Sequence, residues 1–390
     1  MIEINEKYEC CGCTACASVC SHQCITMVED AEGFKYPKVD NEKCVGCGLC
    51  ERVCPMLHPE SNNKVQLVVG AKHKDDGVRK TSSSGGAFSL LAEDFISKGG
   101  IVVGCAMDEN LKAKHIICRS KDELVKLRSS KYVQSDMDGV FVHVRKLLRE
   151  GHKVLFSGTP CQVAGLKRFL IKTFDNLYCI DVLCHGVPSP KLFREYKEQQ
   201  EKRFKSKADF VSFRSKKREW KRLYIDFLFE NGKEYFKYSG YDPYMSLFLN
   251  NKSQRSSCFH CPFTTTSRQG DISLGDFWGI GKAMPKWDDD KGISMVLVNN
   301  AKGQQMFSEI KDVINAIECD INTAINGNKV LCQNISGEQR RNKFYDDYKK
   351  YGYDVAIHKN VHLDNVVKQL YYSVMRRVKD KIYSLLNKGF

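Results

Sequence analysis

The sequence Cys10-Cys-Gly-Cys-Thr-Ala-Cys-Ala-Ser-Val-Cys20 is followed by a second stretch of the same spacing, Cys44-Val-Gly-Cys-Gly-Leu-Cys-Glu-Arg-Val-Cys54. Each stretch contains the pattern C-x2-C-x2-C-x3-C, and Pro55 follows the second one. Ten of the nineteen cysteines of the chain lie in its first 54 residues. Two such runs indicate two metal centres, because short gaps bring several sulfur atoms to one small site.

The spacing is that of bacterial ferredoxins with two [4Fe–4S] clusters, in which the fourth cysteine of each run ligates the other cluster. It therefore predicts an α+β dicluster ferredoxin module that carries electrons. The expected ligands of the first cluster are Cys10, Cys13, Cys16 and Cys54. Those of the second cluster are Cys44, Cys47, Cys50 and Cys20.

Zinc is the main alternative, since C-x2-C pairs also bind zinc. Zinc takes two pairs per ion, however, and not two four-cysteine runs, so iron–sulfur clusters are favoured. A disulfide framework suits a small secreted domain, whereas this chain has 390 residues and lacks the apolar N-terminal stretch of a signal peptide. Cys11 and Cys24 lie off the pattern and are interpreted as packing residues.

The composition favours a cytoplasmic protein of two or three domains. There is no run of about eighteen apolar residues, and abundant thiols are typical of a reducing compartment. The formal net charge of +14 falls by ~4 with two clusters and by ~6 with three, since each cluster with its thiolates carries about −2. The remaining charge suits acidic partners or phosphate-bearing cofactors. Nucleic-acid binding is not favoured, because no known binding motif accompanies the lysines.

Behind the module, apolar strands alternate with helices of about ten residues, which is typical of an α/β domain. We predict the module over 1–60, a polar linker over 58–64, the α/β domain over 65–325 and a helical extension over 326–390. The expected strands are 65–70, 101–105, 154–157 and 177–183, and the expected helices are 86–98, 137–150 and 161–171.

Two further segments predict antiparallel structure. Residues 25–39 are expected to form a hairpin inside the module. Residues 210–213 and 223–229 alternate as strands, with a turn at Asn231-Gly232. The α/β domain is therefore expected to carry an additional antiparallel portion.

Four cysteines outside the module stand in a second informative pattern. Cys161 and Cys184 each follow the carboxyl end of a predicted strand, the edge where open α/β sheets place their sites. Cys258 and Cys261 add a C-x2-C pair, which completes a set of four. We predict a third [4Fe–4S] cluster on these four cysteines, with zinc as the alternative. Buried cysteines also pack as small apolar residues, which is the interpretation for Cys105, Cys118, Cys179, Cys319 and Cys332.

A loop of small residues, Thr81-Ser-Ser-Ser-Gly-Gly86, precedes the helix predicted at 86–98. Such a loop exposes backbone N–H groups at a helix N-terminus and suits a phosphate group. An ordinary helix cap by Ser84 is the alternative. Arg128 and Lys131 offer charge for a phosphate, Tyr132 a ring for stacking, and Asp276, Phe277 and Trp278 lie among glycines at 270–279.

These segments together resemble the coenzyme F420 hydrogenase/dehydrogenase beta-subunit family of iron–sulfur flavoproteins. The matching segments are Ser83-Ser-Gly-Gly86, Ser130-Lys-Tyr-Val-Gln134, Gly158-Thr-Pro-Cys-Gln162, Cys184-His-Gly186, Cys258-x2-Cys261 and Gly275-Asp-Phe-Trp-Gly279. The resemblance implies an FAD-binding α/β domain with a cluster close to the flavin. It implies FAD contacts from Ser83, Ser84, Gly85, Gly86, Arg128, Lys131, Tyr132, Thr159, Gln162, Asp276 and Trp278.

The function implied is an FAD- and [4Fe–4S]-dependent oxidoreductase, in which a flavin takes two electrons as hydride and releases them singly. The expected partners are a ferredoxin or other redox protein and a small-molecule hydride carrier of the F420 type or another kind. His185 and Lys131 are the candidate catalytic residues; for His185 a structural role is the alternative. A pure electron-transfer subunit that feeds a partner enzyme is the rival function.

The C-terminal segment is expected to form a helix over 363–386 with one apolar stripe and many basic residues. Docking on the rest of the protein or on a partner is favoured over peripheral contact with a membrane surface.

Overall fold

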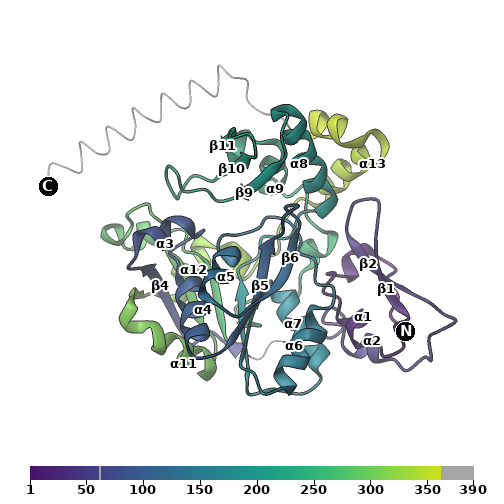
Figure 1. The fold of residues 1–390 in the computed structure, drawn as a ribbon, viewed down its shortest axis with the longest axis horizontal. Helices are drawn as coiled ribbons and strands as arrows, with labels where there is room; N and C mark the ends of the chain where they lie inside the picture. Colours follow the sequence, from purple (N-terminus) through teal and green to yellow (C-terminus); the bar gives the residue numbers. More distant parts are fainter. Residues whose placement is uncertain (61–62, 362–390) are drawn as a thin grey trace.

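The structure is a computed structural model that describes residues 1–60 and 63–361. Figure 1 shows three parts: the N-terminal cysteine-rich module at one side, a large sheet domain, and a smaller lobe above it. The expected helix at 363–386 lies outside the described residues. In the described part of the chain, no helix is both long and apolar enough to span a lipid bilayer.

The N-terminal module consists of short elements around the two cysteine runs. They are η1 (Lys7–Glu9), α1 (Ala15–Val19), β1 (Ile25–Glu29), β2 (Lys35–Val39) and α2 (Leu49–Arg52). Strands β1 and β2 pair antiparallel, so the hairpin predicted at 25–39 is confirmed. Each cysteine run turns at a residue with positive φ, and Gly46 and Gly48 provide two of these turns.

The sheet domain contains one mixed sheet of eight strands in the order β15-β4-β14-β13-β8-β7-β5-β6. The strands are β4 (Leu67–His73), β5 (Ile101–Met107), β6 (Ala113–Cys118), β7 (Val154–Gly158), β8 (Leu177–Val182), β13 (Ile272–Asp276), β14 (Ser294–Val298) and β15 (Ile314–Glu318). The four central strands β5, β7, β8 and β13 are parallel, and the strands at both edges are antiparallel. The predicted α/β sheet is confirmed.

Helices cover both faces of this sheet. On one face α4 (Ala87–Ser97) and α11 (Ala301–Ile310) pack on the strands, and on the other α6 (Val140–Arg149) and α7 (Pro160–Leu170) do so. The module joins the second face, because Cys13 and Ala15 belong to the same buried cluster as α6 and α7. The remaining short helices of this domain are α3 (Asp76–Thr81), α5 (Lys121–Leu124), η2 (Val125–Leu127), α10 (Ile280–Ala283), η5 (Pro285–Trp287), η6 (Lys311–Val313), α12 (Ile321–Gly327) and η7 (Lys329–Leu331).

The upper lobe contains the predicted antiparallel portion. Strands β9 (Ala208–Ser212), β10 (Tyr224–Phe229) and β11 (Glu234–Tyr238) form a three-stranded sheet, with a turn at Gly232. Helices α8 (Pro190–Phe204), α9 (Pro243–Leu249) and α13 (Glu338–Asn360) pack with it around an aromatic core. Phe34 of the module lies in the same core and is fully buried. The lobe therefore holds the module as well as the sheet domain.

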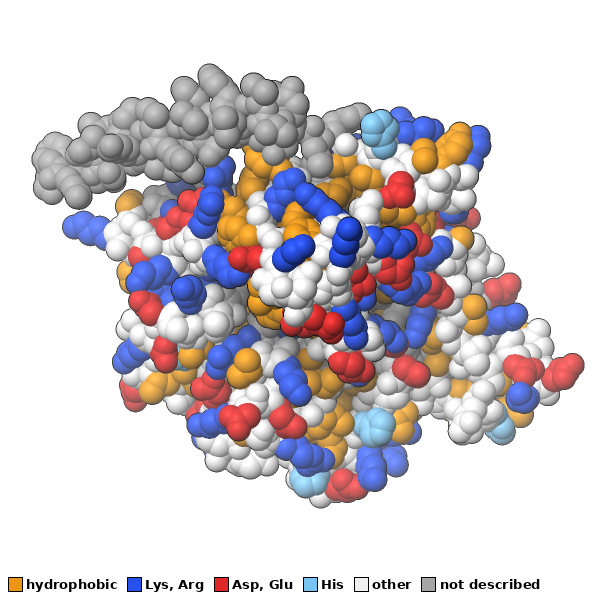
Figure 2. All heavy atoms as spheres, turned by 45° about the horizontal axis from the view of Figure 1, so that its top comes forward, with side chains coloured by type: hydrophobic (Ala, Val, Ile, Leu, Met, Phe, Trp, Pro, Cys, Tyr) orange, Lys and Arg blue, Asp and Glu red, His pale blue; other side chains and the backbone are white. Residues whose placement is uncertain are grey.

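The module is also fixed by a buried ion pair. Glu32 and Arg341, both almost fully buried, form a direct ion pair between the module and α13. Gly33 lies next to it, and a Cβ atom there would come within 2.5 Å of the Ser189 Oγ atom. Elsewhere on the surface, Lys and Arg side chains alternate with Asp and Glu on the face shown in Figure 2, without one continuous basic area.

Candidate functional site

The carboxyl edge of the central strands brings the candidate residues together. Strands β7 and β8 are parallel neighbours, so the chain leaves both at the same edge of the sheet. Cys161 follows β7 as the second residue of α7, and Cys184 follows β8 after one intervening residue. The prediction that both cysteines follow the carboxyl ends of strands in one sheet is confirmed, and the structure adds that the two strands are neighbours. Strand β13 ends beside β8 at the same edge and places Asp276 there.

The C-x2-C pair reaches this edge through a short 3-10 helix, η4 (Ser256–His260). The Arg255 backbone N–H donates to the Val187 carbonyl at 2.9 Å, which ties the start of η4 to the loop after β8. Gly186 in that loop has a φ of +83°, and a Cβ atom there would lie 3.1 Å from the Cys258 Cβ atom. Glycine at this position therefore allows the two cysteine-bearing segments to approach closely.

All four cysteines line one small cavity of about 40 Å³. Burial, and then the thiols of Cys258, Cys161 and Cys261, hold the pKa of Cys184 well above its usual range. Burial likewise raises the pKa of Cys258 to about 12. A metal cluster would bind these groups as thiolates and release their protons. In residues 1–60 and 63–361, no three His, Cys, Asp or Glu side chains lie close enough to hold a single metal ion; a cubane distributes its four thiolates over four separate irons.

Cysteines from both runs of the module lie close to one another. Burial raises the pKa of Cys16 to about 12, and the thiols of Cys10 and Cys54 act in the same direction. Cys54 of the second run thus lies with the first run. The two cysteines off the pattern are buried, and each lies beside an expected ligand: the Cys24 sulfur is 3.2 Å from that of Cys20, and Cys11 lines the small cavity.

A larger cavity of about 580 Å³ lies next to the small one. The candidate catalytic residue His185 lines it, and so do most predicted cofactor residues: Ser83, Ser84, Gly86, Arg128, Lys131, Tyr132, Thr159, Gln162, Asp276 and Trp278. Gly85 does not line it. It lies against β4 and β14, where a Cβ atom would come within 2.1 Å of the Ala71 carbonyl oxygen. Its role is to allow this close packing, which holds the loop in place.

The serine-rich loop begins helix α4 without a side-chain cap. Gly86 is the N-cap residue, with a φ of +89°. The alternative interpretation, a helix cap by Ser84, is wrong, because the Ser84 hydroxyl donates to the Ile293 carbonyl at 2.6 Å. The Ser83 hydroxyl accepts from the backbone N–H of Ser130 at 2.6 Å. The two loops expected to contact a cofactor are thus joined, and the N-terminus of α4 borders the cavity.

Arg128 and Lys131, the two residues predicted to bind a phosphate, both contact other protein groups. Arg128 forms an ion pair with Glu93 at 2.9 Å and donates to the Ser89 hydroxyl. The Lys131 Nζ atom donates to the carbonyls of Lys126 at 3.1 Å and Arg128 at 2.8 Å. Burial lowers the pKa of Lys131 to about 8. Both residues border the cavity, and protein groups hold their charged ends in place.

The lowered pKa of Lys131 has a consequence for stability. In an unfolded chain a lysine titrates near 10.4, so between about pH 8 and pH 10 the unfolded state binds more protons at this site than the folded state. The free energy of unfolding should therefore rise with pH in this range, by no more than about 1.4 kcal/mol per pH unit. We expect Lys131→Met to reduce this slope, measured as the melting temperature from pH 7 to pH 10. The matched control is Lys126→Met at an exposed position; equal slopes in wild type and Lys131→Met would contradict the prediction.

Aromatic and acidic residues complete the large cavity. The Tyr132 ring stacks on Phe248 at 4.4 Å, and the Trp278 ring stacks on Trp220 at 4.6 Å. The Asp276 carboxylate forms an ion pair with Arg214 and accepts from the Trp220 indole N–H at 3.2 Å. One face of Trp278 is thus covered by protein, and the charge of Asp276 is compensated.

Several site residues had no signal in the sequence. Arg214 from the upper lobe is almost fully buried and also donates to the Tyr132 hydroxyl at 3.1 Å. His115 lines the cavity, and burial lowers its pKa to about 4. Residues 327–330, expected to belong to a separate helical extension, lie in the cavity wall as well. They come from distant parts of the chain and carry no recognisable motif.

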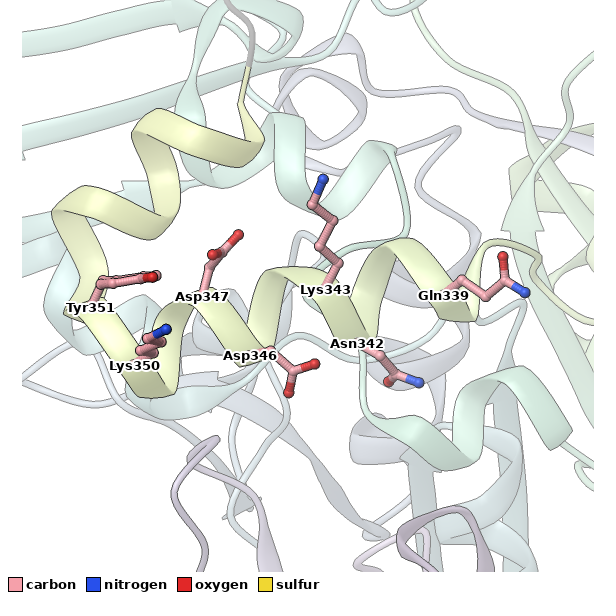
Figure 3. A pocket seen from close by; sticks show the side chains of 7 residues that line it. All are labelled: Gln339, Asn342, Lys343, Asp346, Asp347, Lys350 and Tyr351. Atoms are coloured by element: carbon pink, nitrogen blue, oxygen red, sulfur yellow. The ribbon is translucent and has the colours of Figure 1, made fainter.

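His185 is an exposed residue in the loop that follows β8. Its Nε2 atom is 3.0 Å from the Asn251 Oδ1 atom, and its ring packs edge-on against Phe248. His185 lines the large cavity, whereas Cys184, Gly186 and Val187 line both cavities. The two cavities therefore share a wall. A separate surface hollow of about 500 Å³ lies along α13 alone and brings no residues of the site together (Figure 3).

Comparisons with known proteins agree with this arrangement. Residues 68–141 match the family model for the N-terminal part of the coenzyme F420 hydrogenase/dehydrogenase beta subunit, and residues 151–322 match the model for its C-terminal part. Residues 9–57 match the model of a 4Fe-4S dicluster domain. The two beta-subunit models together cover more than half of the chain.

Individual relatives are more distant. An F(420)H(2) dehydrogenase subunit of Methanosarcina mazei is 24% identical over 339 residues, which covers 81% of this chain and 86% of that protein. The coenzyme F420-dependent sulfite reductase of Methanocaldococcus jannaschii is 30% identical over 197 residues, which covers 48% of this chain and 29% of that protein. A chain of the F420-reducing [NiFe] hydrogenase complex of Methanosarcina barkeri aligns with a TM-score of 0.47 and 15% identity, covering 73% of this chain and 94% of that one. The chain belongs to the coenzyme F420 hydrogenase/dehydrogenase beta-subunit family, and its N-terminal module is of the 4Fe-4S dicluster kind.

Proposed function

We propose that the chain is an iron–sulfur flavoprotein oxidoreductase. It moves electrons between its dicluster module and an FAD that exchanges hydride with a small molecule or coenzyme. The observation that carries this proposal is the shared wall: Cys184 borders the cavity of the four cysteines and also the large cavity. A cluster on Cys184 would adjoin any cofactor bound in the large cavity.

The four cysteines of the sheet domain fit a third [4Fe–4S] cluster. Each lines the same cavity, and they come from three segments that the fold holds together. Two of the segments are the ends of neighbouring parallel strands, and the third is tied to them by a backbone hydrogen bond. With the two clusters of the module, the chain would carry three.

The large cavity fits a flavin nucleotide. Its volume of about 580 Å³ is within the range of small-molecule sites, and it combines aromatic rings with the N-terminus of α4. That N-terminus suits a phosphate group. Arg128 and Lys131 contribute positive potential from the wall, although their direct contacts are to protein atoms. The bound FAD would supply the exchange between one hydride and two single electrons.

The residues of the chain would perform three tasks in this reaction. The loop at 82–86 and the joined loop at 128–132 would bind the cofactor. The ion pair of Arg214 with Asp276 would keep the upper lobe closed over the sheet edge and exclude water. His185 remains the candidate for proton transfer, since it is exposed beside the wall that Cys184 forms and its Nε2 atom is held by Asn251.

The second candidate is an electron-transfer subunit that feeds a partner enzyme. The observation in its favour is the outer cysteine run of the module, where Cys47 and Val45 are exposed. A redox partner protein could dock there. The Methanosarcina mazei relative is itself named as a dehydrogenase subunit. The substrate, and the cytoplasmic location that the composition favours, remain predictions.

The test is anaerobic purification with iron counting and flavin extraction, followed by reduction with reduced F420, reduced nicotinamide and reduced ferredoxin. We expect about twelve irons per chain, from three clusters of four, and one FAD, with flavin bleaching by a hydride donor. Fully iron-loaded protein without FAD would overturn the proposal. Flavin that only reduced ferredoxin bleaches would instead support the electron-transfer subunit.

A further inference from the structure

Arg255 is a fully buried cation at the junction between the module and the sheet domain. Its exposed fraction is 0%, and it lies three residues before the first cysteine of the C-x2-C pair. Its Nε atom donates to the Cys10 carbonyl at 2.6 Å, and one terminal nitrogen donates to the Lys35 carbonyl at 2.9 Å. The guanidinium group also lies 4.2 Å from the centre of the Tyr36 ring. It therefore holds the first cysteine run of the module against the sheet domain.

The partners of this cation are all neutral. Besides the two carbonyls, it donates to the Gln134 Oε1 atom at 3.2 Å. Among residues 1–60 and 63–361, no Asp or Glu carboxylate forms an ion pair with Arg255. Other buried arginines differ in this respect, since Arg268 pairs with Asp181 and Arg341 with Glu32. A buried charge without a counter-ion is costly, so the site of Arg255 requires a negative charge from another source.

Two expected anions lie on either side of it. On one side is Cys10, an expected ligand of the first module cluster, whose carbonyl Arg255 binds. On the other side is the small cavity, which Arg255 lines together with Cys258 and Cys161. Each [4Fe–4S] cluster with its thiolates carries a net negative charge of about −2. Two clusters at these places would provide the compensation that the protein groups lack.

We infer that Arg255 is the shared counter-charge of the first module cluster and the inner cluster, and that it sets their reduction potentials. The inference rests on the proposed function, because it needs both clusters. A cluster gains negative charge when it is reduced, so a nearby buried cation stabilises the reduced form and raises the potential. In the step between the clusters, one electron leaves the iron of one and enters the iron of the other, and no bond or proton is exchanged. Since the electron stays beside the same cation, Arg255 favours neither direction strongly.

The close contacts around Arg255 leave little freedom for its position. A Cβ atom at Gly12, which has a φ of +72°, would come within 2.9 Å of the Arg255 Nη1 atom. The Gln134 amide nitrogen donates to the Cys11 carbonyl at 3.0 Å, so Gln134 contacts both the module and the arginine. The cation is thus positioned by the backbone of the first cysteine run itself.

The test is a redox titration of each cluster, followed by electron paramagnetic resonance on anaerobically purified protein. In Arg255→Met we expect the first module cluster and the inner cluster to titrate at lower potential than in wild type. The second module cluster serves as an internal control and should not shift, because none of its expected ligands is among the hydrogen-bond partners of Arg255 or lines the small cavity. Arg255→Lys retains the charge and should shift less than Arg255→Met. Arg79→Met removes another buried arginine, which pairs with Asp289, and should change none of the potentials.

Arg255→Met could also prevent the module from docking, so a second variant is needed. Gln134→Glu places a carboxylate beside Arg255 without removing it, and it should lower the same two potentials. Full iron content with unchanged potentials in either variant would overturn the inference. Wild-type protein with only about eight irons, from two clusters of four, would instead refute the inner cluster of the proposed function, so the two failures are distinguishable.

Discussion

Cys184→Ala is expected to remove about four of about twelve irons per chain, because one [4Fe–4S] cluster loses a ligand. Cys184 is the ligand that borders both cavities, so electrons should no longer pass between the module and the FAD. The clusters of the module should remain, since Cys184 is not among their expected ligands, five of which (Cys16, Cys20, Cys44, Cys50 and Cys54) share a separate group of packed residues within the module. Iron analysis and spin quantification after dithionite reduction would show two clusters in place of three.

The matched control is Cys319→Ala. Cys319 is partly buried, its thiol lies 3.6 Å from the Ile317 carbonyl oxygen, and it does not line either cavity. We expect this variant to keep all its iron. If Cys184→Ala also kept about twelve irons, the inner cluster would not be bound as proposed. If zinc and not iron were lost, the alternative of a zinc site would replace it.

Asp181→Ala is expected to lower the free energy of unfolding by about 3–5 kcal/mol, the usual cost of removing one partner of a buried ion pair. Asp181 is fully buried and accepts from Arg268 at 2.9 Å and from the backbone N–H groups of Gln269 and Gly270 at 2.8 and 2.9 Å. The substitution leaves the Arg268 guanidinium without this carboxylate. Denaturant unfolding followed by circular dichroism, under anaerobic conditions, would measure the loss.

A second effect of Asp181→Ala concerns the inner cluster. Arg268 also donates to the carbonyls of Phe263 and Thr265, in the loop that follows Cys261. The ion pair therefore connects this loop to the end of β8, near Cys184. We expect reduced iron content in the variant, in addition to reduced stability. Asp175→Ala, at an exposed position before β8, should change stability by no more than about 0.5 kcal/mol; a similar small change in Asp181→Ala would contradict the prediction.

Short-range patterns in the sequence predicted much of the fold. The hairpin at 25–39, strands β4, β5, β7 and β8, and helices α4, α6 and α7 were predicted, because short polar segments separate their apolar segments clearly. The edge strands β6 and β15 and the interior strands β13 and β14 were not predicted. β6 carries Lys114 and His115 within a short strand, and its pairing with β5 is antiparallel, so it departs from the alternation of strand and helix.

The residues of the candidate site were likewise predicted only in part. The cysteines were found because ligation to a cluster requires thiols at narrow spacing, a property that the chain carries locally. Arg214, Arg255 and residues 327–330 were not found, because each acts only through residues far away in the chain. The ion pair of Arg128 with Glu93 was also not predicted, because the two residues meet only where the loop that contains Arg128 packs on α4.

The sequence by itself determined the chemistry that the protein can support: sulfur ligands for iron, a glycine- and serine-rich loop before a helix, and an alternation of strands and helices. Each of these features depends on the spacing of a few residues within one short segment, so it can be recognised without knowledge of tertiary contacts. Only the tertiary structure decided which groups meet. The parallel pairing of β7 with β8 brings Cys161 and Cys184 to one edge, and burial at the junction places Arg255 without a carboxylate partner between two expected clusters. The first of these contacts joins segments 23 residues apart and the second joins residues 245 apart. Neither follows from local spacing, because each forms only when the chain folds.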